Sequence, residues 1–320
     1  MSSESNTDPK PDLAQQVIAL TDAAGLVELK DWTTIQLTGE DRVALLHNFC
    51  TADIRGMEDG SVREAFILDG KGKTLGHVWV LKQVDRIWLS TTPGQAERLI
   101  DHLDRYVIRD DVVFQDLTDS VRSGLVAGAK ARESLSTAIP DWNGGSVGSL
   151  QQTDAGWLVA SAELAGNGWL VVVPTDEANG VQQQLIQSGI RSCSLDALHV
   201  LRVRHRTPWY GIDIGPDNLP QELDRDERAI SFDKGCYLGQ ETVARIDALG
   251  RVNRRFRRFR ITSPEPVWVG QEIEVEGKPV GRITTLVWEP IQNEWQALGF
   301  IHRTKAAPGT KLTPEIIVLD

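Results

Sequence analysis

The stretch Lys234-Gly235-Cys236-Tyr237-Leu238-Gly239-Gln240-Glu241 decides how this 320-residue chain is interpreted. It follows a short apolar segment at residues 229–232, which predicts the end of a strand. A helical pattern starts at Gly239, with apolar side chains at every third position, and Gly250 is a typical C-terminal cap. The stretch is therefore predicted to be a turn that leads into a helix.

Cys236 is the side chain of this turn with the most distinctive chemistry. It precedes a predicted helix N-terminus, and Lys234 is two residues away. Helix-terminal N–H groups and a nearby ammonium both favour a thiolate. The flanking Gly235 and Gly239 permit a sharp bend or the close approach of a ligand. Two interpretations stay open: a reactive thiol, or a small buried cysteine that packs beside a tight turn.

These eight residues resemble the K-G-C-[FY]-x-G-Q-E motif of the YgfZ-type folate-binding proteins, which are relatives of the glycine cleavage T-protein. That relative is a tetrahydrofolate-dependent aminomethyltransferase. The resemblance implies an α+β fold of the aminomethyltransferase (GcvT-like) type, with two interlocked antiparallel-sheet subdomains around a central cleft and a small C-terminal β-barrel. It also implies that the cleft binds tetrahydrofolate or a related folate, and that the protein acts in the assembly or repair of iron–sulfur proteins.

Composition restricts the class of protein. A formal net charge of −11 argues against a general nucleic-acid binder. No apolar run approaches the ~18 residues of a membrane-spanning helix. The polar residues 1–12 lack the apolar segment of a secretory signal and are interpreted as a disordered tail. Three separated cysteines favour a reducing cytoplasm, and the histidine spacing predicts no metal site.

Short strands and helices follow one another in an order that predicts an α+β arrangement rather than parallel βαβ units. The expected helices cover residues 13–24, 43–50, 96–107, 177–188, 196–204 and 239–249. The expected strands cover residues 32–37, 63–68, 75–81, 86–90, 111–117, 121–127, 169–173, 272–275, 281–287 and 295–301, with a last one from 311 onward. We divide the chain into a polar tail with the start of the first helix (1–22), a folate-binding region of two subdomains (23–250) and a β-barrel (251–320).

The resemblance continues outside the turn. Residues 202–213 resemble the family stretch R-x-E-A-G-x-P-x-[FY]-G-x-D, which makes Tyr210 and Asp213 candidate folate-binding residues. Arg204 stands where the family has a glutamate that holds the pterin. A carboxylate accepts hydrogen bonds from the pterin amino and N–H groups, whereas a guanidinium only donates. This departure puts the pterin end of the expected pocket in question.

Two further positions concern the same expected site. Asp53 occupies the acidic position of a T-x-D-[IV] segment that follows the family's opening helix, or it is simply a polar residue in a turn. The transferases carry an acidic pair on the strand after a hairpin, where this chain has Gly76-His77. His77 has a pKa suited to proton transfer, but a histidine on an apolar strand is also a common structural residue. We therefore expect no aminomethyl transfer.

Residues 251–260 contain six arginines. Arginine binds carboxylates through two hydrogen bonds, so Arg254 and Arg255 are candidates for a cationic rim that holds a folate glutamyl tail. The alternative is a charged strand and linker.

The favoured function is a tetrahydrofolate-binding factor that supports iron–sulfur proteins, with little or no catalysis. An active aminomethyl- or methyltransferase is the first alternative, supported by the fold and weakened by Gly76-His77 and Arg204. A partner-binding module that has lost folate is the second, and Arg204 is its main support.

Overall fold

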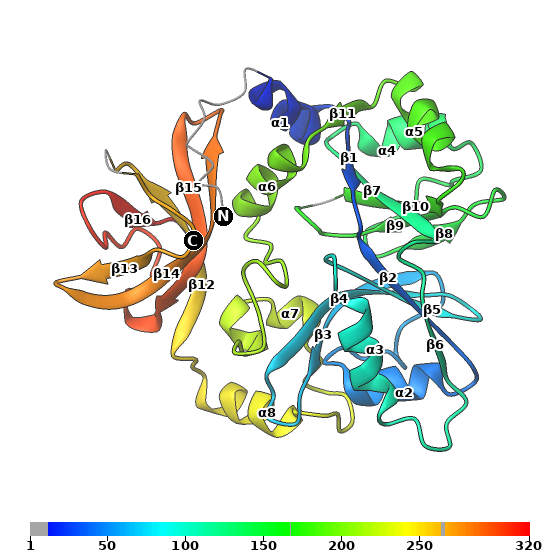
Figure 1. Ribbon diagram of the computed structural model, residues 1–320, viewed down its shortest axis with the longest axis horizontal. Helices are drawn as coiled ribbons and strands as arrows, with labels where there is room; N and C mark the ends of the chain where they lie inside the picture. Colours follow the sequence, from blue (N-terminus) through cyan, green and yellow to red (C-terminus); the bar gives the residue numbers. More distant parts are fainter. Residues whose placement is uncertain (1–11, 167, 264–265) are drawn as a thin grey trace.

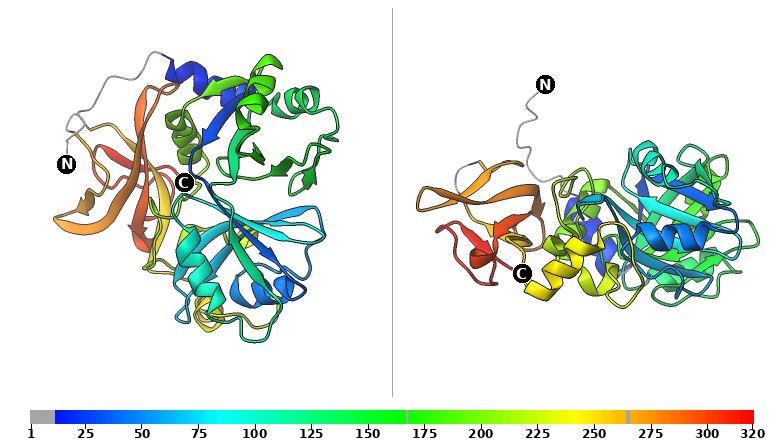
Figure 2. Two further views of the ribbon diagram at one scale, coloured as in Figure 1. Left: turned by 45° about the vertical axis from the view of Figure 1, so that its right-hand side comes forward. Right: turned by 90° about the horizontal axis from the view of Figure 1, so that it is seen from below.

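Three sheets form the architecture seen in the computed structural model, which describes residues 12–166, 168–263 and 266–320 (Figure 1). Sheet 1 has six strands in the order β11-β1-β7-β10-β9-β8, sheet 2 has five in the order β3-β4-β5-β2-β6, and sheet 3 has five in the order β13-β14-β15-β12-β16. The view from below in Figure 2 shows sheet 3 at one end of the molecule, with yellow and green helical segments between it and the other two sheets. The predicted α+β fold class is confirmed.

Sheets 1 and 2 are interlocked because the chain starts sheet 1, builds all of sheet 2, and then returns to complete sheet 1. The strands of sheet 1 are β1 (Gly25–Leu29), β7 (Val121–Ala127), β8 (Leu150–Gln152), β9 (Leu158–Ser161), β10 (Gly168–Pro174) and β11 (Arg191–Cys193). Those of sheet 2 are β2 (Thr33–Thr38), β3 (Ser61–Leu68), β4 (Thr74–Lys82), β5 (Ile87–Thr91) and β6 (Val113–Asp116). The pairing is antiparallel except between β1 and β11, which run parallel.

Helices pack on three faces of these two sheets. The outer face of sheet 2 is covered by α2 (Arg42–Phe49) and α3 (Ala96–Asp104), and the outer face of sheet 1 by α4 (Ala131–Ala138) and α5 (Ala178–Gln187). The inner face of sheet 1 packs with α1 (Leu13–Asp22) and α6 (Leu195–Arg204). Helix α3 turns Ala96, Leu99 and Leu103 toward the core of sheet 2, at the spacing of an amphipathic helix. The opposite face of sheet 2 joins sheet 1 in the largest hydrophobic cluster. Because both of its faces are covered, β5 is buried along its whole length.

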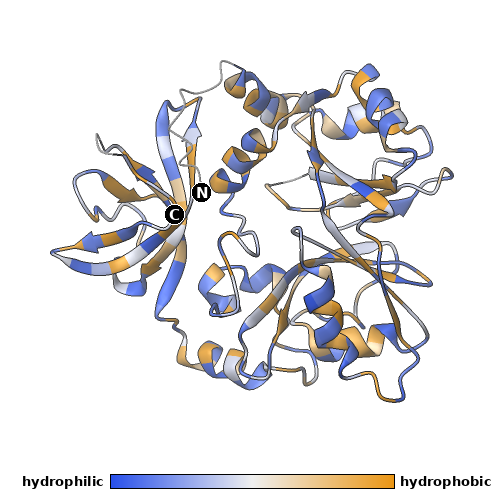
Figure 3. Ribbon diagram, viewed as in Figure 1, coloured by the Kyte–Doolittle hydropathy of each residue, from blue (hydrophilic) through white to orange (hydrophobic). Residues whose placement is uncertain are grey.

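Sheet 3 stands where a small C-terminal β-barrel is predicted, and it is curled into a half-barrel. Its strands are β12 (Arg254–Ile261), β13 (Glu272–Val275), β14 (Lys278–Glu289), β15 (Glu294–His302) and β16 (Ile316–Val318), with the short helix η2 (Arg303–Lys305). Figure 3 shows hydrophilic and hydrophobic residues interleaved along these strands, so that each presents one face to a core. Helix α6 lies between sheet 3 and sheet 1, which explains why it is buried on most sides.

Three short helices follow α6 in the chain and pack between sheet 2 and sheet 3: η1 (Pro220–Leu223), α7 (Asp226–Ala229) and α8 (Gln240–Leu249). The strand end predicted at residues 229–232 is wrong. The N–H groups of Ala229 and Ile230 bond back to the carbonyl groups of Arg225 and Asp226, which makes a helical turn. A short apolar run fits a buried strand or a buried turn equally well, and here burial in a cluster with Tyr237 favours the turn.

The remaining expectations concern the ends of the chain and its division. The polar tail lies, up to residue 11, outside the described residues. The expected boundary at residues 250 and 251 falls in the link between Leu249 of α8 and Arg254 of β12, and we retain the three-part division as a proposal. Among the described residues, no helix combines the length and the hydrophobicity needed to span a bilayer.

Candidate functional site

The Lys234–Glu241 turn is anchored by its lysine. The Lys234 ammonium donates hydrogen bonds to the carbonyl oxygens of His47, Cys50 and Ala52, the latter two at 2.8 Å. These carbonyl groups belong to the C-terminal end of α2 and the residues after it, so the cation satisfies acceptors that the helix leaves unpaired. Burial lowers the pKa of Lys234. The ammonium is thus committed to α2, and none of its recorded hydrogen bonds goes to Cys236.

Gly239 fixes the other end of this turn. Its φ of +82° lies in the left-handed region, and a Cβ there would sit 2.6 Å from the carbonyl oxygen of Asp69. Only glycine fits both constraints. The Leu238 N–H donates to the carbonyl oxygen of Asn48, and the Thr242 hydroxyl donates to that of Lys71. The motif therefore fastens α8 onto α2 and onto the β3–β4 hairpin.

Cys236 itself is exposed, whereas Cys50 and Cys193 are buried. Burial raises the pKa of each of the two buried thiols to about 11. The interpretation of Cys236 as a buried packing residue is therefore wrong. A reactive role for this thiol stays a prediction.

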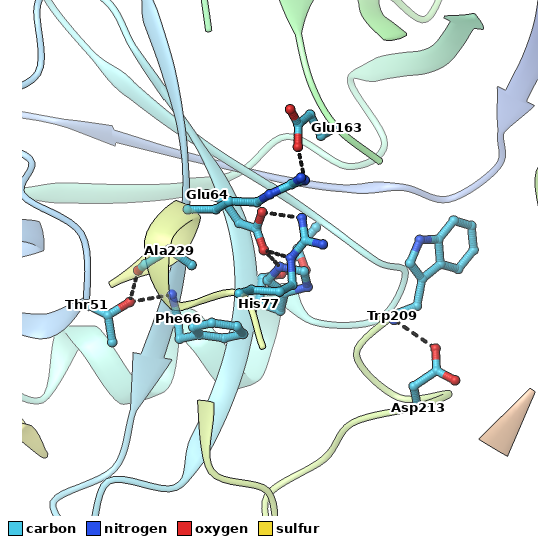
Figure 4. Close-up of polar contacts among 11 residues, drawn as sticks. Thr51, Glu64, Phe66, His77, Glu163, Trp209, Asp213 and Ala229 are labelled. Atoms are coloured by element: carbon cyan, nitrogen blue, oxygen red, sulfur yellow. Dashed lines mark hydrogen bonds and ion pairs between the residues drawn. The ribbon is translucent and has the colours of Figure 1, made fainter. Parts of the chain in front are cut away.

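A buried charge cluster lies beside the hairpin. Glu64 of β3 accepts hydrogen bonds from both Nε and Nη2 of Arg225, and its Oε1 is 2.6 Å from Nε2 of His77 on β4 (Figure 4). All three side chains are buried. Burial alone would raise the pKa of Glu64, but the charge of Arg225 and the contact with His77 outweigh it and hold that pKa well below its usual range.

His77 has the surroundings of a structural residue. Its ring stacks on Phe66 at 5.0 Å and lies 4.8 Å from the Trp79 ring, and only 1% of the residue is exposed. Because the imidazole is enclosed and bound to Glu64, it presents no free edge to a substrate. The acid/base role stays a prediction that this geometry does not favour.

Thr51 ties α7 to the same strand. Its hydroxyl donates to the carbonyl oxygen of Ala229 and accepts a hydrogen bond of 2.8 Å from the N–H of Phe66 (Figure 4). Two residues on, Asp53 accepts from the Gly56 N–H at 3.1 Å and lies 3.2 Å from Nδ1 of His47. The Gly56 hydrogen bond is the main cause of the lowered pKa of Asp53. These contacts fit the alternative of a polar residue in a turn.

A central cleft opens above this framework. One part, a cavity of about 280 Å³, lies between β3, β4 and the loop after β9, and includes Glu64, Trp79 and Glu163 in its wall. A second part of about 240 Å³ extends along residues 229–233. Both parts are lined by Arg63, Glu227 and Arg228. We use "central cleft" for the two cavities together.

The charges at this cleft differ in their pairing. Arg228 forms an ion pair with Glu163, which joins α7 to the loop after β9 (Figure 4). Arg63 and Glu227 have no hydrogen-bond or ion-pair partner for their side chains within the described part of the chain. Within the described residues, the cleft therefore offers the free guanidinium of Arg63 and the free carboxylates of Glu227 and Asp233 to a ligand.

The residues predicted from the family stretch at 202–213 are occupied by other contacts. Arg204 pairs with the fully buried carboxylate of Glu289, which joins α6 to β14. Asp213 accepts a hydrogen bond from the N–H of Trp209 (Figure 4). It also accepts from Arg202 and from the hydroxyl groups of Thr284 and Thr285. Neither residue lines the central cleft as defined above.

Tyr210 is likewise enclosed. The Arg98 guanidinium lies 4.2 Å over its ring and donates to its hydroxyl group. Burial raises the pKa of the Tyr210 phenol.

The arginines of β12 pair with carboxylates in η1 and at its C-terminal end. Arg254 donates to Glu222 at 2.8 Å, and Arg255 and Arg257 both pair with Asp224. These contacts match the alternative of a charged strand. Binding of a glutamyl tail by Arg254 and Arg255 stays a prediction.

Sequence reasoning missed the charged residues that line the cleft or lie beneath it: Arg63, Glu64, Glu163, Arg225, Glu227 and Arg228. One signal was present, because Arg63 and Glu64 precede four apolar residues within a predicted strand. A charge on such a strand needs a buried partner or a solvent-filled cleft. Among the described residues, no group of three His, Cys, Asp or Glu side chains is arranged to hold a metal ion.

The chain belongs to the family described as GCVT N-terminal domain, whose model matches residues 6–234. Within this family it is a YgfZ-type relative of the aminomethyltransferases. It is 27% identical over 250 residues to the tRNA-modifying protein YgfZ of Yersinia enterocolitica, covering 78% of this chain and 74% of that protein. It is 26% identical over 302 residues to the putative chloroplastic transferase At1g60990 of Arabidopsis thaliana, covering 90% and 67%.

A solved structure shares this fold. The glycine cleavage system aminomethyltransferase T of Bartonella henselae superposes with a TM-score of 0.85 at 18% identity, covering 96% of this chain and 88% of that one. This likeness confirms the GcvT-like architecture.

Proposed function

We propose that this protein binds tetrahydrofolate or a close derivative in the central cleft and supports the assembly or repair of iron–sulfur proteins, with little or no catalysis of its own. Membership of the GCVT N-terminal domain family supports the folate ligand. The observation that carries the proposal is the presence of the unpaired Arg63 and Glu227 on the shared wall of the cleft. The cysteine spacing supports a cytoplasmic location.

Glu227 supplies what Arg204 lacks. A pterin presents an amino group and a ring N–H that need acceptors, and a free carboxylate accepts both. Arg204 only donates, and Glu289 already occupies it. In our proposal Glu227 accepts from the amino side of the pterin, while Arg63 donates to its ring carbonyl oxygen. The pterin site is then built from β3 and α7 rather than from the end of α6.

Calorimetric titration with tetrahydrofolate tests this assignment. A charge-assisted hydrogen bond contributes ~1.5–3 kcal/mol, so Glu227→Gln and Arg63→Gln should each weaken binding at least about tenfold. Glu274→Gln on β13 and Arg109→Gln are matched controls, since both residues are exposed and remote from the cleft lining. Unchanged affinity in both cleft variants, with the wild type binding, would mean that the folate lies elsewhere.

Catalysis is expected to be absent or poor. The acidic pair of the transferases is replaced by Gly76-His77, and His77 is enclosed by Phe66 and Trp79. General acid–base groups contribute ~10²–10⁴-fold to such reactions. Purified protein with glycine-cleavage partners and tetrahydrofolate should therefore stay near background. Robust turnover that His77→Ala abolishes would make the protein an active aminomethyltransferase.

The exposed thiol of Cys236 is the candidate group for the iron–sulfur role. Cys236→Ala should leave stability nearly unchanged, because the side chain is exposed, and should abolish rescue of iron–sulfur enzyme activity in a strain that lacks this protein. Alkylation at neutral pH should label Cys236 before the buried Cys50 and Cys193. Full rescue by Cys236→Ala would show that the motif is a structural turn only.

Two alternatives remain: a role in tRNA modification, and a partner-binding module without folate. The YgfZ relatives are named as tRNA-modifying, whereas the net charge of −11 argues against direct binding of tRNA by this chain. A partner-binding module without folate is supported by the Arg204–Glu289 pair. The absence of any heat of binding with tetrahydrofolate would favour that module.

A further inference from the structure

A second cavity, of about 310 Å³, lies on the outer face of sheet 1 beside α5, at the upper right of Figure 1. It shares no lining residue with the central cleft. Its floor is formed by β1, β7 and β10, and its side wall by the first turns of α5. It therefore needs an explanation separate from folate binding.

Polar side chains in the wall of this cavity lack partners. Those of Glu28, Asn179 and Gln182 make no hydrogen bond or ion pair within the described residues. Arg122 uses only Nη1, which donates to the carbonyl oxygens of Thr118 and Val121. Its Nε and Nη2 groups stay available.

The two charged residues face the cavity from neighbouring strands. Glu28 is directly opposite Gly124 in the β1–β7 ladder, and Arg122 is two residues before Gly124, so all three lie on one face of the sheet. Such diagonal positions are ~7–8 Å apart. No ion pair joins Glu28 to Arg122, although both are described. Opposite charges that share a cavity without touching suit a ligand that carries both charges.

The rest of the floor is apolar and close-fitting. Val171 and Val173 of β10 and Val181 and Leu185 of α5 line it, and each is at most 5% exposed. A Cβ at Gly124 would lie 2.9 Å from Cδ1 of Leu26, so glycine here lets Leu26 pack closely on the strand and add to the apolar lining. An aliphatic group of a few carbons is the complementary shape.

We propose that this cavity binds a free α-amino acid with an aliphatic side chain. Its ammonium group pairs with Glu28, its carboxylate pairs with Arg122, and its side chain contacts the valine and leucine floor. Asn179 and Gln182 supply further hydrogen bonds at the rim. Since the cavity is separate from the central cleft, the proposal does not depend on folate binding.

The test is a titration of the full chain with L-leucine, in which NMR or calorimetry detects binding. N-acetyl-L-leucine lacks the ammonium group, L-leucinamide lacks the carboxylate, and glycine lacks the side chain. We expect saturable binding of L-leucine, with at least about tenfold weaker binding of the other three, which corresponds to ~1.4 kcal/mol for each lost contact.

Two variants assign the contacts. Glu28→Gln should abolish the preference for L-leucine over its N-acetyl form, and Arg122→Gln should abolish the preference over the amide. Glu274→Gln and Arg109→Gln carry the same charge changes at distant exposed positions and should keep both preferences. Thermal unfolding verifies that every variant is folded.

The proposal is overturned if folded wild-type protein shows no saturable binding of L-leucine. It is also overturned if L-leucinamide binds as well as L-leucine, which would indicate recognition of a peptide N-terminus. Equal binding by Glu28→Gln and wild type would place the ligand outside this cavity.

Discussion

The arginines of β12 and Arg63 in the wall of the central cleft differ in the structure, because the former have carboxylate partners and the latter has none among the described residues. Arg254, Arg255 and Arg257 come from a segment dense in positive charge, and each is paired with a carboxylate of its own chain. Arg63 lies near the start of β3, exposed just before a continuous run of buried residues, and has no hydrogen-bond or ion-pair partner among the described residues. The number of charges in a segment is thus a poor guide to the charge that is available to a ligand.

The reason is that a partner carboxylate removes a guanidinium from use. Asp224 alone accepts hydrogen bonds from Arg255 and Arg257, so the carboxylates in and after η1 neutralise the arginines of β12. An isolated arginine on a cleft wall has no such partner and keeps its donors free. Four measurements test whether its partners decide what a charged side chain contributes.

The largest effect is expected for the buried carboxylate beneath the cleft. Glu64→Ala leaves Arg225 buried without its counter-ion, and breaking a buried pair in this way costs ~3–5 kcal/mol of unfolding free energy. Glu163→Ala is the matched variant, because it breaks the exposed pair with Arg228, where a loss of less than ~1 kcal/mol is expected. Urea denaturation measures both. Equal losses of unfolding free energy would show that the buried Glu64–Arg225 pair contributes no more to stability than the exposed Glu163–Arg228 pair.

The next effect concerns the shared partner of the β12 arginines. Asp224 has a φ of +53°, which asparagine also tolerates, so Asp224→Asn removes the charge and keeps the backbone. We expect a loss of about 2 kcal/mol, since charge-assisted hydrogen bonds to Arg255 and Arg257 are weakened together. Asp85→Asn, beside the exposed Arg86, should change stability by less than ~0.5 kcal/mol. A loss no larger than that of the control would mean that β12 does not need its carboxylate.

The third effect is on ligand affinity. Arg255→Gln should leave tetrahydrofolate affinity unchanged for mono- and polyglutamate forms, because Asp224 already holds the guanidinium. Arg63→Gln should lower the affinity for both about tenfold, or ~1.4 kcal/mol. If Arg255→Gln weakened the binding of only the polyglutamate form, and did so most at low salt, the hypothesis of a cationic rim would be supported.

The smallest effect is a pH dependence at α7. Burial, and then the charge of Asp224, raises the pKa of Asp226 from 3.8 to about 6. The folded state therefore holds this proton more tightly than the unfolded chain, so the contribution of Asp226 to stability is greatest below pH ~4 and is lost as the pH rises through 6. Asp226→Asn should remove this fall and add ~1 kcal/mol at pH 7, a value reduced for partial exposure. Parallel stability curves for the two proteins between pH 4 and 7 would contradict the assignment.

The sequence was most informative where residues close together specify a local structure. The Lys234–Glu241 turn can be recognised from eight consecutive residues. Gly239 in this turn has a positive φ and lies close to the hairpin, so the glycine of the motif has a local structural cause. The hairpin of β3 and β4 and the helix α3 were predicted from periodicity for the same reason.

The candidate site was predictable only in part, because its contacts join residues far apart in the chain. Glu64 and Arg225 are separated by 161 residues, and no local pattern pairs them. The sequence shows Arg204 as a departure from the family motif, but it does not show the partner Glu289, which lies in sheet 3. The free state of Arg63 and Glu227 is a property of the folded surface, so it became visible only when the neighbours of each were known.

The interlocked order of sheets 1 and 2 has a consequence for synthesis of the chain. Sheet 2 is contained in residues 33–116 and can form as soon as these residues have left the ribosome, whereas β1 must wait for β7 and for β11 at residues 191–193. At ~5–20 residues per second, the nascent chain carries an incomplete apolar edge at β1 for on the order of ten seconds. The first strand of sheet 1 is therefore, with β11, the last strand of sheets 1 and 2 to be fully paired, and during that interval it is exposed to pairing with the wrong neighbour.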